Sequence, residues 1–107
     1  LNGKLEDTGW IPIGSNVKYR KKAGIVTVIG NSDGEITLPK FDGTVTVATL
    51  PEEVRPTAQI LTLATQKSSS GYVTQVRIFV EGQISLCNLN PNYASSYWGF
   101  TVSYPAD

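Results

Sequence analysis

Residues 72–88, YVTQVRIFVEGQISLCN, are the stretch of sequence that decides the fold. Apolar and polar residues alternate on either side of Gly82, which is the period-two pattern of two half-buried strands joined by a turn. A three-residue loop, residues 80–82, lets Gly82 take the positive φ of a bulged turn. A two-residue turn would shift the register by one residue and move apolar residues of the second strand to the polar face. The bulged register, which we expect, pairs Val76 with Leu86 and Ile78 with Ile84.

The rest of the chain is also typical of β-structure. Val, Ile and Thr are abundant, and clusters of Gly, Pro, Asn or Asp interrupt the sequence at intervals of roughly 8–12 residues. The sequence therefore predicts an all-β fold, an antiparallel β-sandwich that is jelly-roll-like, with about eight or nine short strands. The expected strands are Gly9–Ile13, Val17–Lys21, Ile25–Ile29, Glu35–Leu38, Thr44–Leu50, Ala58–Gln66, Tyr72–Val80, Gln83–Asn88 and Trp98–Tyr104.

The length of the chain, 107 residues, is that of one domain with a single core. We expect residues 1–107 to form one β-sandwich domain, with residues 1–8 as a linker. The chain opens at Leu1 and contains no methionine, so we expect it to be a C-terminal piece of a longer protein.

The charge balance argues against a nucleic-acid partner. Nine basic and nine acidic residues give a formal net charge of zero, with no run of like charges beyond residues 20–22. Phosphate binding needs a concentrated basic face, which this composition does not provide. No apolar run approaches the ~18 residues that a membrane-spanning helix needs, so we also expect no membrane partner.

The sequence lacks residues that several kinds of catalysis usually need. The chain contains no histidine, so it has no Ser–His or Cys–His pair and no histidine metal ligand. Cys87 is the only cysteine and cannot form an internal disulfide; we expect it to be a packing residue in a protein that folds in a reducing compartment. Glu52 and Glu53 are adjacent, and we expect solvated surface rather than the separated carboxylates of a glycosidase. We therefore expect a protein that is not an enzyme and has no cofactor and no metal.

Two loops are expected to shape the fold. Residues 50–56, LPEEVRP, are predicted to form a proline-bracketed corner between two sheets, and we expect Arg55 to tie this corner to backbone carbonyls or to a carboxylate. Residues 31–34, NSDG, are predicted to form a turn. Asp33 in this turn lacks the spaced acidic ligands of a calcium-binding loop.

Two segments have more apolar side chains than the core-facing side of a single strand would bury. Residues 25–29 are apolar on both faces except at Thr27, so we expect the core to cover one face and another layer or a neighbouring subunit to cover the other. The last strand carries a row of large apolar residues on one face, which we expect in the core or in a subunit interface. The members of this row are Trp98, Phe100, Val102 and Tyr104.

Residues 88–97 form the longest stretch without a strand pattern, and they are the candidate binding site. Three asparagines, two serines and two tyrosines lie within these residues. Amides and hydroxyls hydrogen-bond to sugar hydroxyls, and aromatic rings cover the apolar face of a sugar. The same composition is typical of an ordinary polar crossover, because Asn and Pro favour turns. The candidate saccharide-binding residues are Asn88, Asn90, Asn92, Tyr93 and Tyr97.

Three pieces of sequence, in order along the chain, carry a resemblance to a known family. They are Trp10, residues 17–30 (VKYRKKAGIVTVIG) and residues 50–56. The later strand that ends near Gly82 and the aromatic-rich residues 98–104 agree with them. The chain resembles the C-terminal domains of tail, baseplate or tail-fibre proteins from phages of Gram-positive bacteria. The resemblance covers nearly the whole chain, and no binding residue is carried over from it.

This resemblance implies a small all-β head, commonly a homotrimer, at the distal end of a phage tail. We therefore expect a receptor-binding head domain that adsorbs to host cell-wall saccharide without catalysis, with weak sites multiplied by trimeric and whole-virion avidity. Other tail or baseplate proteins are further implied partners, reached through upstream domains. The protein would be made in the cytoplasm of the bacterial host and would act at the tail or baseplate tip of the virion.

Two other functions stay open at this point. A structural head would only trimerise or cap a fibre. A carbohydrate-binding module of a secreted bacterial protein would be a monomer beside a catalytic domain. If residues 88–97 are only a crossover, we expect the binding site at residues 31–34, at residues 67–72 or around Trp10.

Overall fold

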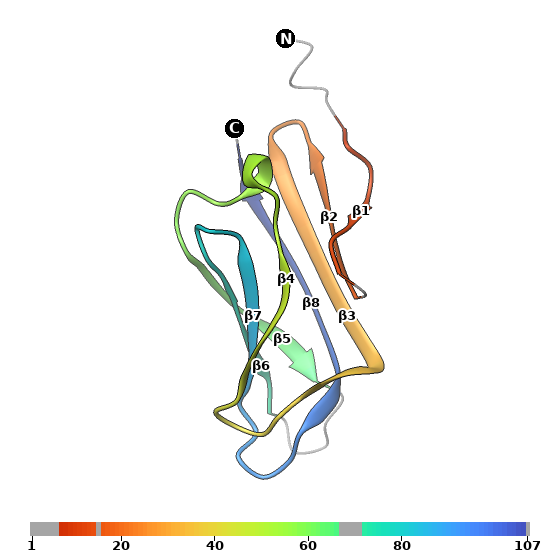
Figure 1. Cartoon of the computed structure of the whole chain (residues 1–107), viewed down its shortest axis with the longest axis vertical. Coiled ribbons are helices and arrows are strands. Elements are labelled where there is room, and N and C mark those ends of the chain that lie inside the picture. The colour runs from red at the N-terminus through yellow and green to blue at the C-terminus, as the bar shows by residue number, and fades with distance from the viewer. Residues whose placement is uncertain (1–6, 15, 67–71, 107) are drawn as a thin grey trace.

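The structure, a computed structural model, describes residues 7–14, 16–66 and 72–106. These residues form mainly β-strands, with one short 3₁₀-helix, Glu52–Val54, and among them there is no α-helix (Figure 1). The strands are β1 (Ile11–Pro12), β2 (Val17–Lys22), β3 (Ile25–Leu38), β4 (Thr44–Thr49), β5 (Ile60–Gln66), β6 (Thr74–Ile78), β7 (Gln83–Asn88) and β8 (Ser95–Pro105).

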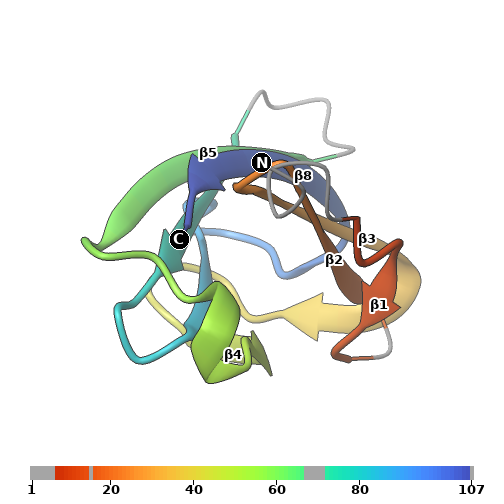
Figure 2. The same ribbon diagram turned by 90° about the horizontal axis from the view of Figure 1, so that it is seen from above.

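These strands form a single curled antiparallel sheet in the order β1-β2-β3-β8-β5-β6-β7-β4. β5 joins the two halves of the sheet, because Thr65 and Gln66 pair with β8 while residues 60–64 pair with β6. Seen from above, the sheet curls round so that β4 lies opposite β5 and β8 (Figure 2). The expected all-β antiparallel sandwich is therefore confirmed, and its two layers are parts of one sheet.

The β6–β7 hairpin has the register that its sequence predicts. Val76 pairs with Leu86 and Ile78 with Ile84, and all four side chains are fully buried. Gly82 closes the three-residue loop with a φ of 100°. Because these four inward-facing side chains are apolar, this part of the hairpin forms one wall of the core.

Three of the four aromatic residues of β8 point into the core from the opposite side. Trp98, Phe100 and Tyr104 are all buried, and the rings of Trp98 and Phe100 are stacked with their centroids 6.2 Å apart. The Tyr104 hydroxyl donates a hydrogen bond to the Val54 carbonyl, and burial raises the pKa of Tyr104 above its ordinary value. These three residues of the aromatic row therefore belong to the core and not to a subunit interface.

β3 is longer than expected, because it continues through residues 31–34, which the sequence predicts as a turn. Its pairing with β8 shifts after Asp33, where β3 bends (Figure 1). The Ser32 hydroxyl holds this bend, because it accepts a hydrogen bond from the Ile36 N–H (3.0 Å) and donates one to the Ser96 carbonyl (2.8 Å). The predictions of a turn and of two separate strands are therefore wrong: the turn-forming residues bend one continuous strand.

The corner at residues 50–56 is held as the sequence predicts. Arg55 Nε donates to the Leu50 carbonyl (3.0 Å), and the 3₁₀-helix lies within the connection between β4 and β5. The Leu50 N–H donates to the Gly82 carbonyl (2.9 Å), so the tip of the β6–β7 hairpin rests on this corner. Both glutamates of the corner are exposed, as expected.

The chain before β1 is attached to β2 by an ion pair. The backbone of Asp7 forms an isolated antiparallel β-bridge with Lys22. The Arg20 side chain forms the ion pair, and its Nε donates a hydrogen bond to Asp7 Oδ1 (2.8 Å). Hydrogen bonding to the Arg20 guanidinium lowers the pKa of Asp7 well below its usual range. The end of the expected linker is thus tied to the sheet, and residues 1–6 lie outside the described residues.

Candidate functional site

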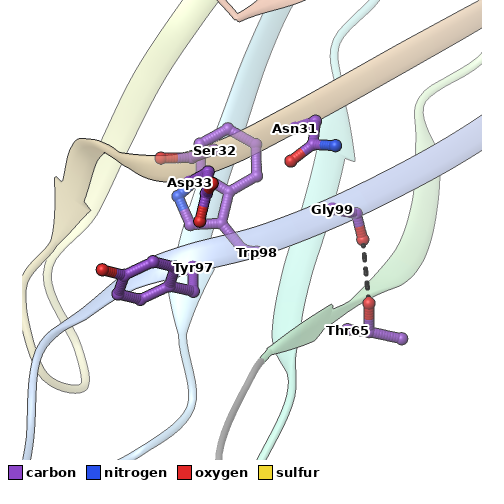
Figure 3. Close-up of a pocket in the computed structure, with 7 residues that line it drawn as sticks. All are labelled: Asn31, Ser32, Asp33, Thr65, Tyr97, Trp98 and Gly99. Carbon is purple, nitrogen blue, oxygen red and sulfur yellow. Dashed lines mark hydrogen bonds between the residues drawn. The ribbon is translucent and has the colours of Figure 1, made fainter.

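One of the five residues that the sequence predicts for a saccharide site, Tyr97, lies in a hollow on the outer surface of the sheet (Figure 3). This hollow, called the Tyr97 hollow below, has a volume of about 370 Å³ and is formed by β3, β8 and β5. Its lining residues are Asn31, Ser32, Asp33, Thr65, Tyr97, Trp98 and Gly99.

The register of the sheet explains why a hollow forms here. Asn31 pairs with Gly99, and Gly99 pairs with Thr65, so three strands contribute one cross-strand row. Gly99 stands in the middle of this row, and a Cβ built there would meet one heavy atom, 3.6 Å away. In the next row Asp33 pairs with Tyr97, and both residues are exposed. The floor is therefore backbone, and polar and aromatic side chains surround it.

Two buried side chains support the hollow from the core side. Trp98 Nε1 donates to the Ile36 carbonyl (3.2 Å), and Ser32 bonds to the same bend of β3. On the outer side the Thr65 hydroxyl donates to the Gly99 carbonyl over 3.4 Å (Figure 3). The positions of the exposed residues thus depend on contacts made by the buried ones.

Asn88 and Asn90 are buried, and their side chains hold the crossover between β7 and β8. Asn88 Nδ2 donates to the Tyr93 carbonyl (3.0 Å). Asn88 Oδ1 accepts from Gln66 Nε2 (2.7 Å) and from the Asn90 N–H (2.9 Å). Asn90 Oδ1 accepts from the Asn92 N–H (2.9 Å). Because these amides bond to the protein itself, we place Asn88 and Asn90 behind the surface that a ligand would meet.

Asn92 and Tyr93 are exposed on the crossover, Tyr93 to 73% of its surface, and neither lines the Tyr97 hollow. The structure instead brings Tyr97 together with residues 31–33, which the sequence proposes as an alternative location. It also adds Thr65 and Gly99, which the sequence does not single out for binding. Their role in binding stays a prediction for all of these residues.

The alternative location around Trp10 is occupied by cations of the chain itself. Lys18 Nζ lies 5.3 Å from the centroid of the Trp10 ring, and the Arg20 guanidinium carbon lies 5.9 Å from it. Such contacts use the ring face for cation–π interactions. The other alternative, residues 67–72, lies outside the described residues except for Tyr72.

The chemistry of the Tyr97 hollow is hydrogen bonding and ring contact. An amide, a carboxylate and two hydroxyl groups, from Asn31, Asp33, Thr65 and Tyr97, surround it. Across residues 7–14, 16–66 and 72–106, no three His, Cys, Asp or Glu residues come together as a metal site. No helix in these ranges is both long enough and apolar enough to cross a membrane.

Among solved structures, the crystal structure of the head domain of phage bIL170 is similar to this chain. That head domain is a receptor-binding domain of a lactococcal phage. The similarity covers 92% of this chain and 98% of that chain, with a TM-score of 0.67 and 22% sequence identity. The chain has the fold of that head domain. No protein-family model and no curated protein matches the sequence. The resemblance to phage tail-tip domains that the sequence shows is thereby confirmed at the level of the fold.

Proposed function

We propose that this domain is the receptor-binding head of a phage tail and that it adsorbs to host cell-surface saccharide without catalysis. The fold that it shares with the head domain of a lactococcal phage, over 92% of the chain, carries this proposal. The absence of histidine excludes the Ser–His and Cys–His pairs of many hydrolases, and the zero net charge argues against a nucleic-acid receptor. The domain would act at the tail or baseplate tip of the virion, joined to other tail proteins through upstream segments.

The Tyr97 hollow is the site that we propose for the saccharide. The Tyr97 ring offers a face for the C–H surface of a sugar, while Asn31, Asp33 and Thr65 offer donors and acceptors for its hydroxyls. Asn92 and Tyr93 remain candidates, because they are the exposed polar and aromatic residues of the crossover that precedes β8. One such site is weak by itself, and several engaged copies on one virion give avidity.

Replacing Tyr97 by alanine is expected to weaken saccharide binding about fivefold, or ~1 kcal/mol, because the ring contact is lost. Gly99→Val is expected to weaken it as well, since its side chain fills the floor without removing any hydrogen-bonding group. Binding is measured on an array of bacterial surface polysaccharides and then by titration with the polysaccharide that binds best. Tyr93→Ala tests in the same assay whether the crossover contributes.

Trp98→Ala shows what a loss of folding looks like in this experiment: it should lower the melting temperature, because Trp98 is buried in the core. Tyr97→Ala and Gly99→Val should melt close to the wild type. Unchanged binding in both variants would place the saccharide elsewhere. Failure of the wild type to bind any polysaccharide would favour the purely structural head.

We propose that the domain assembles as a homotrimer, because leucines on β5 are exposed. Leu61 and Leu63 are 58% and 60% exposed on the outer face of the sheet, and Ile25 of β3 is 44% exposed. Stable subunit interfaces bury apolar surface of this kind. Size exclusion with light scattering should give three times the monomer mass, and Leu61→Glu with Leu63→Glu should give a monomer.

A monomeric wild type at micromolar concentration would contradict the trimer and favour a carbohydrate-binding module. If Ile25→Glu dissociates the assembly and the leucine variants do not, the subunits meet on the face of β3 instead. Melting curves of the variants show whether the fold is intact, which we expect because all three side chains are exposed.

A further inference from the structure

A second hollow lies on the outer surface of the other half of the sheet, over β6, β7 and β4. This Cys87 hollow has a volume of about 310 Å³ and shares no lining residue with the Tyr97 hollow. Its floor is β7, which presents the small side chains of Ser85 and Cys87. Arg77 pairs with Ser85 and Gln75 pairs with Cys87, so the longer side chains of β6 stand beside the small ones and form one wall.

Aromatic rings form the other parts of the wall. Phe41, in the connection between β3 and β4, is 52% exposed, and Phe79 follows β6 directly. The Arg77 guanidinium carbon lies 5.7 Å from the centroid of the Phe79 ring. The hollow thus combines two apolar ring surfaces with a cation that one of these rings helps to position.

Two opposite charges line this hollow without forming an ion pair. Among the described residues, Asp42 has no salt bridge, and the only hydrogen bond of the Arg77 side chain is a long one to Gln75 Oε1 (3.5 Å). A carboxylate only accepts hydrogen bonds and a guanidinium only donates them. An occupant that satisfies both must donate at one point and accept at another. An anion would be repelled by Asp42 and a cation by Arg77, so an uncharged occupant is favoured.

We propose that the Cys87 hollow binds one neutral sugar unit, as a second saccharide site on each domain. Hydroxyl groups donate to Asp42 and accept from Arg77 at the same time, and the Phe41 and Phe79 rings cover the C–H face of the sugar. The volume lies at the lower end of the range for small-molecule sites, roughly 300–1,000 Å³, which suits a single unit. This inference rests on the lining of the Cys87 hollow alone and holds whether or not the Tyr97 hollow binds.

The single cysteine of the chain reports on this hollow directly. Cys87 is half-buried on its floor, so a bound sugar should slow the reaction of its thiol with a maleimide. The probes are D-glucose, D-galactose and L-rhamnose, each added separately to the assembled protein, with inorganic phosphate as the anionic comparison. At a sugar concentration equal to its Kd, the labelling rate should fall about twofold, because half of the sites are filled. Phosphate should leave the rate unchanged.

Variants locate the effect within the hollow. Asp42→Asn, Arg77→Gln and Phe41→Ala should each reduce the protection that the sugar gives. Asp33→Asn, which changes the matching acidic residue of the Tyr97 hollow, should leave it unchanged. Equal protection in all four variants would overturn the proposal, since the sugar would then act elsewhere.

Three other results would also overturn it. Protection by phosphate alone would show an anion site, and no protection by any of the three sugars would show that the hollow binds none of them. A thiol that does not react in the assembled protein would show that the hollow is closed, either by the chain's own side chains or by a neighbouring subunit. None of these results depends on binding at the Tyr97 hollow. That binding is tested separately, with Tyr97→Ala and Gly99→Val, so the two proposals can fail independently.

Discussion

Replacing Ile78 by alanine is expected to lower the free energy of unfolding by about 2–5 kcal/mol. Ile78 is fully buried in the β6–β7 hairpin and pairs with Ile84, which is fully buried as well. Alanine would remove apolar contacts and leave a cavity that a sheet, held by hydrogen bonds on both sides, closes only in part. The midpoint of urea unfolding, measured with an unchanged slope, gives the loss directly.

The matched control is the neighbouring residue on the opposite face. Arg77 is exposed on the same strand, so Arg77→Ala should change the free energy of unfolding by no more than about 0.5 kcal/mol. Equal losses at the two positions would mean that both faces of β6 are buried in the protein in solution. Such a result would contradict the division into an inner and an outer face on which both hollows depend.

The hairpin could be predicted from sequence because its signals are local. Alternation over residues 72–88 sets the inward face, and only the three-residue loop at Gly82 keeps that face apolar on both strands. Arg55 was predictable for the same reason, since its hydrogen bond to the Leu50 carbonyl closes a corner within a few residues. When the residues that interact are close together in the chain, their sequence pattern is compatible with few alternative structures.

The bend in β3 shows where local signals fail. Asn, Ser, Asp and Gly in succession normally predict a turn between strands. Here the Ser32 hydroxyl bonds to Ser96, and the Trp98 indole bonds to Ile36, so these contacts hold the bend against β8 and the strand pairs with β8 on both sides of it. These partners lie more than sixty positions away along the chain. No periodicity within residues 31–34 could reveal them.

The candidate site was predictable only in part for the same reason. Composition identified residues 88–97, but asparagine serves equally well in a ligand site and in a turn, and Asn88 and Asn90 hold the crossover. The Tyr97 hollow exists because β8 pairs with β3 on one side and with β5 on the other. That order of strands brings Asn31 and Thr65 together across Gly99, and it is set by the fold as a whole.

The contact between the hairpin and the corner was likewise invisible in the sequence, and it makes Gly82 a sensitive position. A Cβ built on Gly82 would lie 2.7 Å from the Leu50 carbonyl oxygen and 2.7 Å from Arg55 Nε. Relieving this overlap would disturb the Leu50 N–H bond to Gly82 (2.9 Å) and the Arg55 bond to Leu50 (3.0 Å). Each lost hydrogen bond costs about 1 kcal/mol, in addition to the strain of a positive φ.

Gly82→Ala is therefore expected to lower the free energy of unfolding by about 3 kcal/mol or more. Gly24→Ala is the matched control, because Gly24 also has a positive φ, 80°, but a Cβ there would meet nothing within 4 Å. The control isolates the backbone strain of a non-glycine residue, about 1–2 kcal/mol. Urea unfolding of the two variants gives the difference, which measures how tightly the hairpin tip rests on the corner. Equal losses would show that the tip stands clear of residues 50–56 in solution, and that the corner and the hairpin are stabilised separately.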